Sequence, residues 1–136
     1  MSLQPEEIEH INLVNWFHHT YPELADDFHH FANERKCSQQ RGRILKRMGV
    51  KKGVSDLFLA FPHNGYHGLW IELKVDSKAS KVQLVFGERK KQRGYDFRVT
   101  YGFESSKEYI LSYLINYTPY CSQSNTKILY NNNPIC

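Results

Sequence analysis

Two neighbouring stretches, 54-VSDLFLAF-61 and 66-YHGLWIELKV-75, decide the fold of this 136-residue sequence. The first is almost wholly apolar, as expected for a strand that is covered on both faces. The second alternates in the manner of a strand, whose successive side chains point to opposite faces. Between them stands Pro62-His63-Asn64-Gly65, which has the composition of a turn. We therefore predict two strands, over 54–61 and 66–75, joined by this turn.

The second stretch carries charged residues on one of its two faces. By alternation its aliphatic side chains share one face, while Trp70, Glu72 and Lys74 share the other. In the first stretch Asp56 is the only charged residue. A carboxylate in a strand that is buried on both sides is costly unless it is paired or binds a metal. The turn would bring Asp56 close to Glu72, although the pairing register of the two strands cannot be read from the sequence.

Two carboxylates and a lysine on one face of a sheet suit the hydrolysis of phosphodiester bonds. Carboxylates are hard oxygen ligands for Mg²⁺ or Mn²⁺, and such an ion polarises a phosphoryl group and lowers the pKa of a bound water. The lysine can stabilise charge that develops on the phosphate. The alternative is an interstrand salt bridge between Lys74 and one carboxylate. An isolated Glu-x-Lys pair favours that alternative, but the apolar flanks and Asp56 weaken it here.

The sequence before the two stretches predicts two helices and a short strand. An amphipathic helix covers 5–20, and Pro5 suits its first turn. A short strand covers 28–32. A second helix covers 38–48, and we expect its apolar side chains to be buried, namely Ile44, Leu45 and Met48.

The sequence after the two stretches continues the alternation. A helix over 80–93 is followed by a strand over 96–101. A last helix is predicted to begin at Ser105, because the spacing of Ser105 to Glu108 fits a capping box. This order of elements predicts an α/β fold, a mixed sheet covered by helices.

Composition bounds the class of protein. The chain has a net charge of +4 and 40% hydrophobic residues, and it lacks the apolar run of about 20 residues that a membrane-spanning helix needs. The N-terminal MSLQPEEIEH lacks the basic and apolar regions of a signal peptide. We expect a cytoplasmic protein, of a bacterium or a phage-infected host cell, with no membrane partner. A single domain over 1–118 accounts for the regular pattern, and 119–136 is a C-terminal tail or an added edge element.

Basic residues gather in two segments of the sequence. They are Arg41, Arg43, Lys46, Arg47, Lys51 and Lys52 in the first, and Arg89, Lys90, Lys91 and Arg93 in the second. Clusters of this kind are more often the solvated face of a helix than a phosphate-binding surface. Alone they do not predict a nucleic-acid partner, but the nearby carboxylates strengthen that interpretation.

Several histidines invite a metal interpretation, including the pairs His18-His19 and His29-His30. None of them has the spacing of a zinc site, and adjacent histidines on a strand point to opposite faces. Structural or surface roles are favoured. His67 is the one histidine that could lie near the carboxylates, because it leads into the strand that carries Glu72.

Three segments together have a more specific pattern than the bare carboxylate–lysine spacing. They are 49-GVKKGVSDL-57, then 66-YHGLWIELK-74, then Ser80 with Gln83 downstream. These segments resemble the virus-type replication-repair nuclease (VRR-NUC) domain of the PD-(D/E)XK nuclease superfamily. The resemblance covers about residues 5 to 115. It implies a restriction-endonuclease-like mixed sheet flanked by helices, and a metal-dependent DNA endonuclease activity.

The resemblance also implies roles for individual residues. Asp56 and Glu72 would bind Mg²⁺ or Mn²⁺, with the backbone carbonyl of Leu73 as a further ligand. Lys74 would be the catalytic lysine, and Gln83 would face the site from a helix.

The family places one more glutamate of the site on its first helix. Glu6 fits best by its spacing to Trp16, and Glu7 and Glu9 are close rivals. A solvated glutamate stabilised by the helix dipole is an equally good interpretation of each. One departure from the family stands at Ser55, where a proline is usual. Since proline supplies no ligand, this change should affect backbone rigidity more than chemistry.

The resemblance finally implies DNA as the partner. The residues expected near phosphates are Arg35, Arg41, Arg43, Lys51 and Lys52. Small stand-alone members of the family look like Holliday-junction resolvases and are implied to form homodimers, which present two sites to a branched substrate. The expected function is thus a structure-directed endonuclease of replication, repair or recombination.

Two alternatives stay open. The first is a non-specific or restriction-like nuclease, which would cut plain duplex as well as branched DNA. The second is a catalytically silent nucleic-acid-binding module. The presence of Asp56, Glu72 and Lys74 argues against the second alternative, because a decayed site would be expected to lose one of them.

Overall fold

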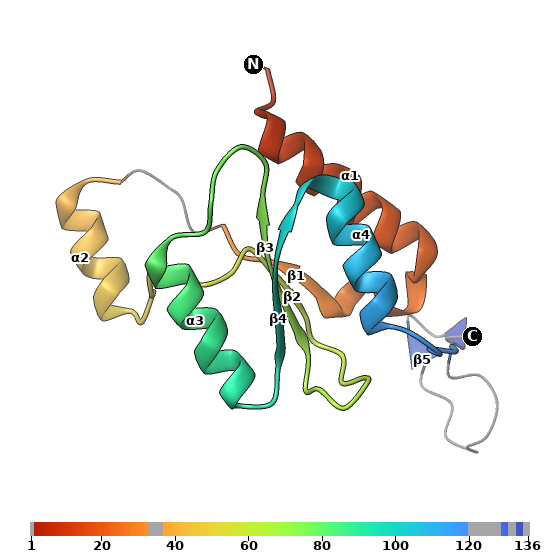
Figure 1. Ribbon diagram of the computed structural model, residues 1–136. Coiled ribbons are helices and arrows are strands. Elements are labelled where there is room, and N and C mark those ends of the chain that lie inside the picture. The colour runs from red at the N-terminus through yellow and green to blue at the C-terminus, as the bar shows by residue number, and fades with distance from the viewer. Residues whose placement is uncertain (1, 33–36, 120–128, 131–132, 135–136) are drawn as a thin grey trace.

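A four-stranded sheet forms the centre of the computed structural model, which describes residues 2–32, 37–119, 129–130 and 133–134 (Figure 1). The strands are β1 (Phe28–His30), β2 (Leu57–Leu59), β3 (Leu69–Lys74) and β4 (Asp96–Tyr101), in that spatial order. The pairs β1–β2 and β2–β3 are antiparallel, whereas β3–β4 is parallel. The mixed sheet that the sequence predicts is therefore present.

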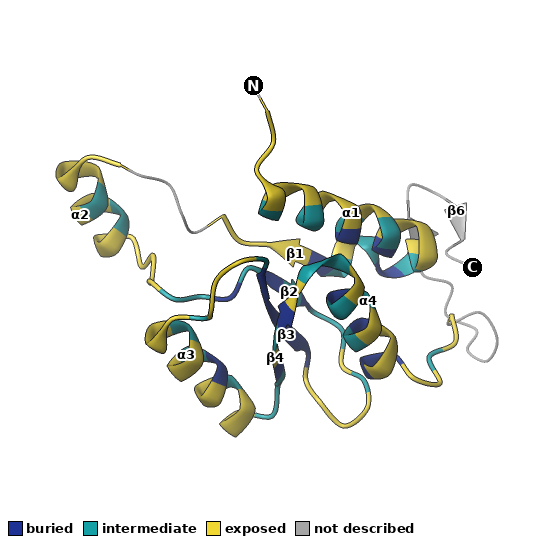
Figure 2. Cartoon of the chain, turned by 45° about the horizontal axis from the view of Figure 1, so that its top comes forward, coloured by how far each residue is buried: buried dark blue, intermediate teal, exposed yellow. Residues whose placement is uncertain are grey.

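Helices cover both faces of this sheet. α1 (Pro5–Thr20) and α4 (Gly102–Tyr113) lie on one face, and α3 (Lys81–Gln92) lies on the other (Figure 1). A short 3-10 helix, η1 (Pro22–Asp27), connects α1 to β1. α2 (Gln39–Arg47) stands apart from the sheet and from the other helices in both ribbon views (Figures 1 and 2). The parallel pair β3–β4 is connected by α3, which is the usual crossover for parallel strands.

The core lies between the sheet and the pair α1–α4. One apolar cluster fills this space. Leu13 and Phe17 of α1 belong to it, as do Ile71 of β3 and Ile110 of α4, and all four are fully buried. Each such side chain contributes about 1.5–3 kcal/mol by leaving water. This packing fixes α1 over the sheet, and with it the position of the N-terminal turns of the helix.

A second, aromatic layer lies on the α3 side of the sheet. The Trp70 ring stacks on Phe58 with centroids 4.2 Å apart, and it meets Phe86 of α3 edge-on at 5.0 Å. Gly87 lets α3 approach closely, because a Cβ atom there would come within 2.1 Å of the Phe97 ring. Gly87 thus packs α3 against Phe97 of β4, and Phe86 packs it against Trp70 of β3, the strand that carries Glu72.

Three sequence predictions need correction. The strand predicted over 54–61 is shorter, since β2 covers only Leu57–Leu59, so that Asp56 stands directly before it. The last helix begins at Gly102 rather than Ser105, and the Ser105 hydroxyl accepts a hydrogen bond from the Tyr101 N–H at 3.2 Å. The N–H groups of the first turn of a helix need acceptors, and here the Phe103 N–H donates to Glu9 Oε2 of α1 at 2.6 Å. The spacing of Ser105 to Glu108 could not reveal an acceptor so distant in the sequence.

The third correction concerns α2. The helix forms as predicted, but no residue is buried within the described range Gln39–Arg47. Ile44 is 40% exposed and Met48, just beyond the helix, is 70% exposed. Apolar spacing indicates a helix, but burial also requires a facing surface, and none of the described helices and strands covers α2 (Figures 1 and 2).

The C-terminal segment is described only at four residues. β5 (Leu129–Tyr130) and β6 (Asn133–Pro134) pair with each other and form a two-stranded sheet of their own. These four residues therefore add no strand to the edge of the main sheet. Among the described residues, no helix combines the length and the apolar character needed to cross a bilayer.

The contact between Gly87 and Phe97 predicts a difference between two helical glycines. Gly87→Ala forces a methyl group into the Phe97 ring, and we expect destabilisation of about 1–3 kcal/mol. Gly42→Ala is the matched control, because its Cβ atom would meet only the Cys37 sulfur at an ordinary 3.8 Å. Thermal melts should show a melting temperature lowered for the first and unchanged or raised for the second. Equal melting temperatures would contradict the packing of α3 described above.

Candidate active site

The register of β2 and β3 brings two carboxylates together. Leu57 pairs with Ile71 in this antiparallel ladder, so the next position along it sets Asp56 beside Glu72. The N–H of Leu73 donates to Asp56 Oδ2 at 3.1 Å. The carbonyl of Asp56 accepts a hydrogen bond from the N–H of Phe31 at 2.7 Å. These contacts fix both the backbone and the side chain of Asp56, and they place the Leu73 peptide at the site.

Glu72 is fully buried and has two partners on one of its oxygens. Its Oε1 accepts a hydrogen bond from Gln83 Nε2 at 2.6 Å and lies 3.3 Å from Lys74 Nζ. Within the part of the chain that the structure describes, the buried Oε2 has no hydrogen-bond partner. A buried carboxylate oxygen without a partner is costly. It therefore marks a position where a cation would be stabilised.

Gln83 is held in place by the start of α3. Its Oε1 accepts from the N–H of Ser80 at 2.7 Å, while its own N–H donates to the Ser80 hydroxyl at 3.3 Å. This reciprocal capping box leaves the Nε2 group to donate to Glu72. Both ends of the Gln83 amide are thus used, one for the helix cap and one for the site.

The first helix contributes Glu6 from its N-terminal turn. Glu6, His10 and Asp56 offer ligand atoms that all lie within 4.8 Å of one another. The two rival glutamates have other partners. Glu7 accepts a hydrogen bond from the N–H of Gln4 at the start of α1, and Glu9 accepts one at 2.6 Å from a backbone N–H of α4. The structure therefore brings Glu6, and neither rival, into the group with Asp56.

Burial and like charge dominate the electrostatics of the site. The pKa of Glu72 is raised to about 8: burial is the largest cause, the charge of Asp56 adds to it, and Lys74 opposes both. Burial lowers the pKa of Lys74, but Glu72, then Asp56 and Glu6, outweigh that effect, so the pKa stays raised and the ammonium stays charged. Burial also lowers the pKa of His10, against the attraction of Asp56.

The donor set fits a hard divalent cation. Asp56, Glu72 and Glu6 supply carboxylate oxygens, and such a cation would offset the repulsion that raises the pKa of Glu72. A groove of about 760 Å³ leads to Asp56 between α1 and the segment after β1. Glu6, His10 and Phe31 are among the residues that line it. An ion can therefore reach Glu6 and Asp56 from solvent.

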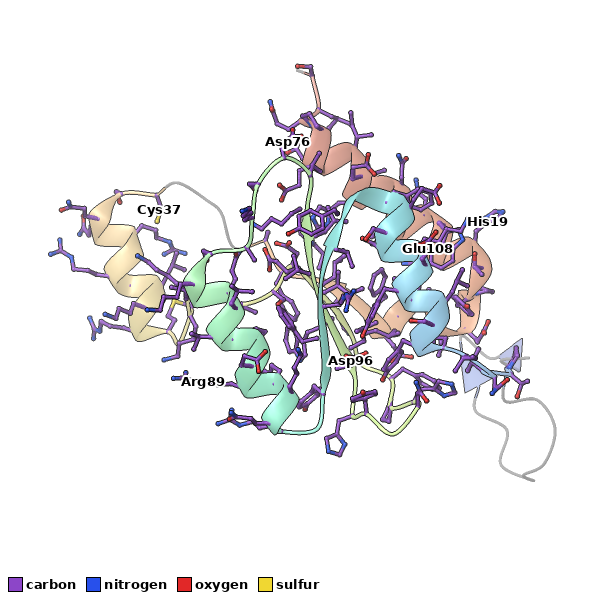
Figure 3. The ribbon with its side chains drawn as sticks, in the orientation of Figure 1. His19, Cys37, Asp76, Arg89, Asp96 and Glu108 are labelled. Carbon is purple, nitrogen blue, oxygen red and sulfur yellow. The ribbon has the colours of Figure 1, made fainter. Side chains whose placement is uncertain are left out.

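The site lies at the carboxyl end of β3. Figure 3 shows Asp76 at this end of the sheet, two residues beyond Lys74, and Asp96 towards the other end. His67, which the sequence suggested as a possible neighbour of the site, precedes β3 and accordingly lies at the end away from Lys74. Its ring packs against Tyr95 with centroids 5.6 Å apart.

The predicted DNA-contacting residues are not part of this cluster. Arg41 and Arg43 are exposed on α2, and Lys51 and Lys52 are exposed on the segment that follows it. α2 lies on the α3 side of the sheet, beyond α3 itself (Figure 1). Arg35, the fifth predicted residue, lies outside the described residues.

His10 is the site residue that the sequence interpretation missed. Its spacing of four residues from Glu6 places both side chains on the same face of α1. That spacing was readable, but it becomes informative only when Asp56 is known to face the same turn of the helix. The His10 ring meets the His30 ring edge-on, with centroids 4.9 Å apart.

The fold matches a solved structure. A structure described as a VRR_NUC domain protein superposes on this chain with a TM-score of 0.70 and 28% sequence identity. The match covers 85% of this chain and 92% of that chain. No protein-family model and no curated protein matches the sequence. The predicted resemblance to the VRR-NUC domain is confirmed, as is the mixed α/β sheet flanked by helices, and the likeness suggests a nuclease.

The raised pKa of Glu72 predicts a pH-dependent difference between two metal-free proteins. The ordinary pKa is 4.5 and the folded value is about 8, so the folded state binds the proton more tightly than the unfolded state. Ionisation therefore costs stability progressively as the pH rises from about 4.5 to 8. Glu72→Gln mimics the protonated form and removes this cost, which is at most a few kcal/mol because each pKa unit corresponds to about 1.4 kcal/mol.

Thermal melts in EDTA at several pH values measure this effect. The melting temperature of Glu72→Gln relative to wild type should rise between pH 5 and pH 9. The ion pair with Lys74 forms only when Glu72 is ionised, and its stabilising effect is already contained in the pKa of about 8, so it does not reverse the trend. A difference that does not change with pH would show that the Glu72 carboxyl ionises normally.

Proposed function

We propose that this chain, whose fold is that of a VRR_NUC domain protein, is a divalent-metal-dependent endonuclease that hydrolyses phosphodiester bonds in DNA. One observation carries the proposal. A buried Glu72 with an unpartnered oxygen lies beside Asp56 and Lys74, and Asp56 in turn lines a groove open to solvent. A purely structural carboxylate would be expected to have both oxygens satisfied.

Each residue of the site has a distinct role in this proposal. Asp56 and Glu72 would hold Mg²⁺ or Mn²⁺, with the carbonyl of Leu73 as a further ligand and Glu6 approaching from α1. An ion held there supplies the polarisation of a phosphoryl oxygen and lowers the pKa of a water molecule. Gln83 keeps the Glu72 carboxylate in one orientation through its hydrogen bond at 2.6 Å.

Lys74 would act on the charge of the reacting phosphate. Its ammonium lies 3.3 Å from Glu72 Oε1 and is nearly buried, so it interacts more strongly with a neighbouring charge than a solvated lysine does. Negative charge increases on the phosphate oxygens as the nucleophile attacks. A fixed ammonium beside them stabilises the transition state more than the ground state.

α2 and the segment after it supply the surface for the DNA backbone. We call α2 and this segment, residues 39–52, the basic arm. Its exposed cations are Arg41, Arg43, Lys46, Arg47, Lys51 and Lys52. The range Gln39–Lys52 contains no acidic residue. A basic helix that stands apart from the body can follow a phosphate backbone without disturbing the packing of the core. The basic arm therefore holds the duplex while the scissile phosphate lies in the groove.

We further propose that the substrate is branched DNA and that the protein acts as a homodimer in replication, repair or recombination. A symmetric dimer places two such sites opposite one another, as needed to cut two strands of a junction. Cleavage of plain duplex as fast as a four-way junction would favour the non-specific or restriction-like alternative. A monomer at micromolar concentration in light scattering would contradict the dimer.

The nuclease proposal predicts metal-dependent cleavage that is abolished in two variants. A labelled four-way junction and a matched linear duplex are incubated with Mg²⁺, Mn²⁺ or EDTA. Wild type should cut in either metal and not in EDTA. Asp56→Asn, which removes a metal ligand, and Lys74→Ala, which removes the cation beside the phosphate, should each lower the single-turnover rate by about 100-fold or more.

Matched controls separate this result from a general change of charge. Asp26→Asn and Arg98→Ala change exposed residues outside the site and outside both basic clusters, and both should cut as wild type does. Binding of the junction by wild type without cleavage in any metal would contradict the nuclease proposal and favour the silent binding module.

The role of α2 predicts a salt-dependent effect on binding. Arg41→Ala with Arg43→Ala should weaken DNA binding and lower the slope of log Kd against log salt by about 0.9 for each phosphate that the variant no longer neutralises. Arg98→Ala is the matched control, since Arg98 is exposed on β4 and lies over the Tyr109 ring at 5.2 Å. An unchanged slope in the double variant would place the DNA elsewhere on the surface.

A further inference from the structure

We propose that His10 completes, with Glu6 and Asp56, a mixed nitrogen–oxygen site that takes Mn²⁺ in preference to Mg²⁺. This inference deepens the proposed function and rests on it, because the site shares Asp56 with the catalytic carboxylates. The ion would occupy a position distinct from that between Asp56 and Glu72, since Glu72 does not belong to the group of three ligands.

The geometry of α1 supports a site built from two of its side chains. Glu6 and His10 are one helical turn apart and face the same direction. Their ligand atoms and a carboxylate oxygen of Asp56 lie within 4.8 Å of one another, which lets one ion contact all three. Leu13 and Phe17 anchor α1 in the core, so the two ligands are presented by a rigid element.

The surroundings of His10 also favour metal binding. Its Nδ1 is buried and, among the described residues, has no hydrogen-bond partner. The His30 ring meets it edge-on at 4.9 Å and restricts its orientation. A ring nitrogen that is removed from water and left without a donor or acceptor is costly. A metal ion bound to one ring nitrogen would satisfy that nitrogen. The other ring nitrogen could then form a hydrogen bond to a water molecule or a backbone group.

The ligand types determine which ion is preferred. Mg²⁺ takes oxygen ligands in a nearly ideal octahedron and keeps several of its waters. Imidazole suits transition metals, and Mn²⁺ accepts both imidazole and carboxylate ligands. One nitrogen among the three ligands therefore favours Mn²⁺ at this position. The position between Asp56 and Glu72 has only oxygen ligands and should accept either ion.

Access to the proposed site is open. Glu6, His10 and Asp56 all line the groove of about 760 Å³. The same groove leads to Asp56, so an ion bound by His10 would lie on the path of a substrate phosphate that approaches Asp56. It would add positive charge where the DNA backbone enters.

Titration with Mn²⁺ alone tests the proposal without any cleavage assay. Free Mn²⁺ is counted by electron paramagnetic resonance in full-length protein stripped with EDTA, and folding is checked by circular dichroism. Wild type should bind two Mn²⁺ per chain. His10→Ala should bind only one ion, or bind the second about tenfold more weakly or worse. In the same titration Mg²⁺ should compete poorly for the His10 position.

Two further variants keep the test specific. His29→Ala removes an exposed histidine of β1 and should bind both ions as wild type does. His10→Asp replaces the nitrogen with oxygen, and it should restore two ions while shifting the competition towards Mg²⁺.

The outcomes separate this inference from the proposed function. Two ions in both wild type and His10→Ala, with equal affinities, would overturn the role of His10. One ion in wild type, absent in Glu72→Gln and kept in His10→Ala, would overturn the second site while the nuclease proposal stands. No Mn²⁺ bound by wild type at millimolar concentration would contradict both.

Discussion

The buried carboxylate of Glu72 is the constraint on which the rest of the site depends. A charge removed from water must be compensated or it will take up a proton, and the adjacent Asp56 makes ionisation harder still. Lys74 and Gln83 compensate one oxygen and leave the other without a partner. The free-energy cost of this buried oxygen would be offset by a bound cation, and the carboxylates around it are the donors that such a cation needs.

The fold brings residues to the site from both sides of the sheet. α3 is held close by the contact of Gly87 with Phe97, and its capping box aims Gln83 at Glu72. α1 is held from the other side by its buried apolar face, which brings its first turn to Asp56. Core packing thus sets the distance from Gln83 to Glu72 and the distance from Glu6 to Asp56. A shift of either helix would change these distances and with them the proposed metal site.

Sequence periodicity predicted which charged side chains of the two neighbouring stretches lie together better than it predicted their surroundings. Alternation in 69–75 placed Glu72 and Lys74 on one face, and an isolated Asp56 in an apolar strand marked the second carboxylate, because these signals are local. Contacts between distant segments decide the register that joins them, and they bring Glu6 and His10, rather than Glu7 or Glu9, close to Asp56. The exposure of α2 was missed for the same reason, since Ile44 and Met48 have helical spacing whether or not a partner surface exists.

The most direct test of the proposed metal site is the location of the metal itself. Crystals of the wild-type chain soaked in Mn²⁺ give an anomalous difference map that shows the ion independently of any catalytic assay. We expect an ion within about 2.5 Å of carboxylate oxygens from both Asp56 and Glu72. A map with Mn²⁺ bound only elsewhere, and with the Glu72 and Asp56 oxygens free of it, would contradict the central claim that these buried carboxylates form a metal site.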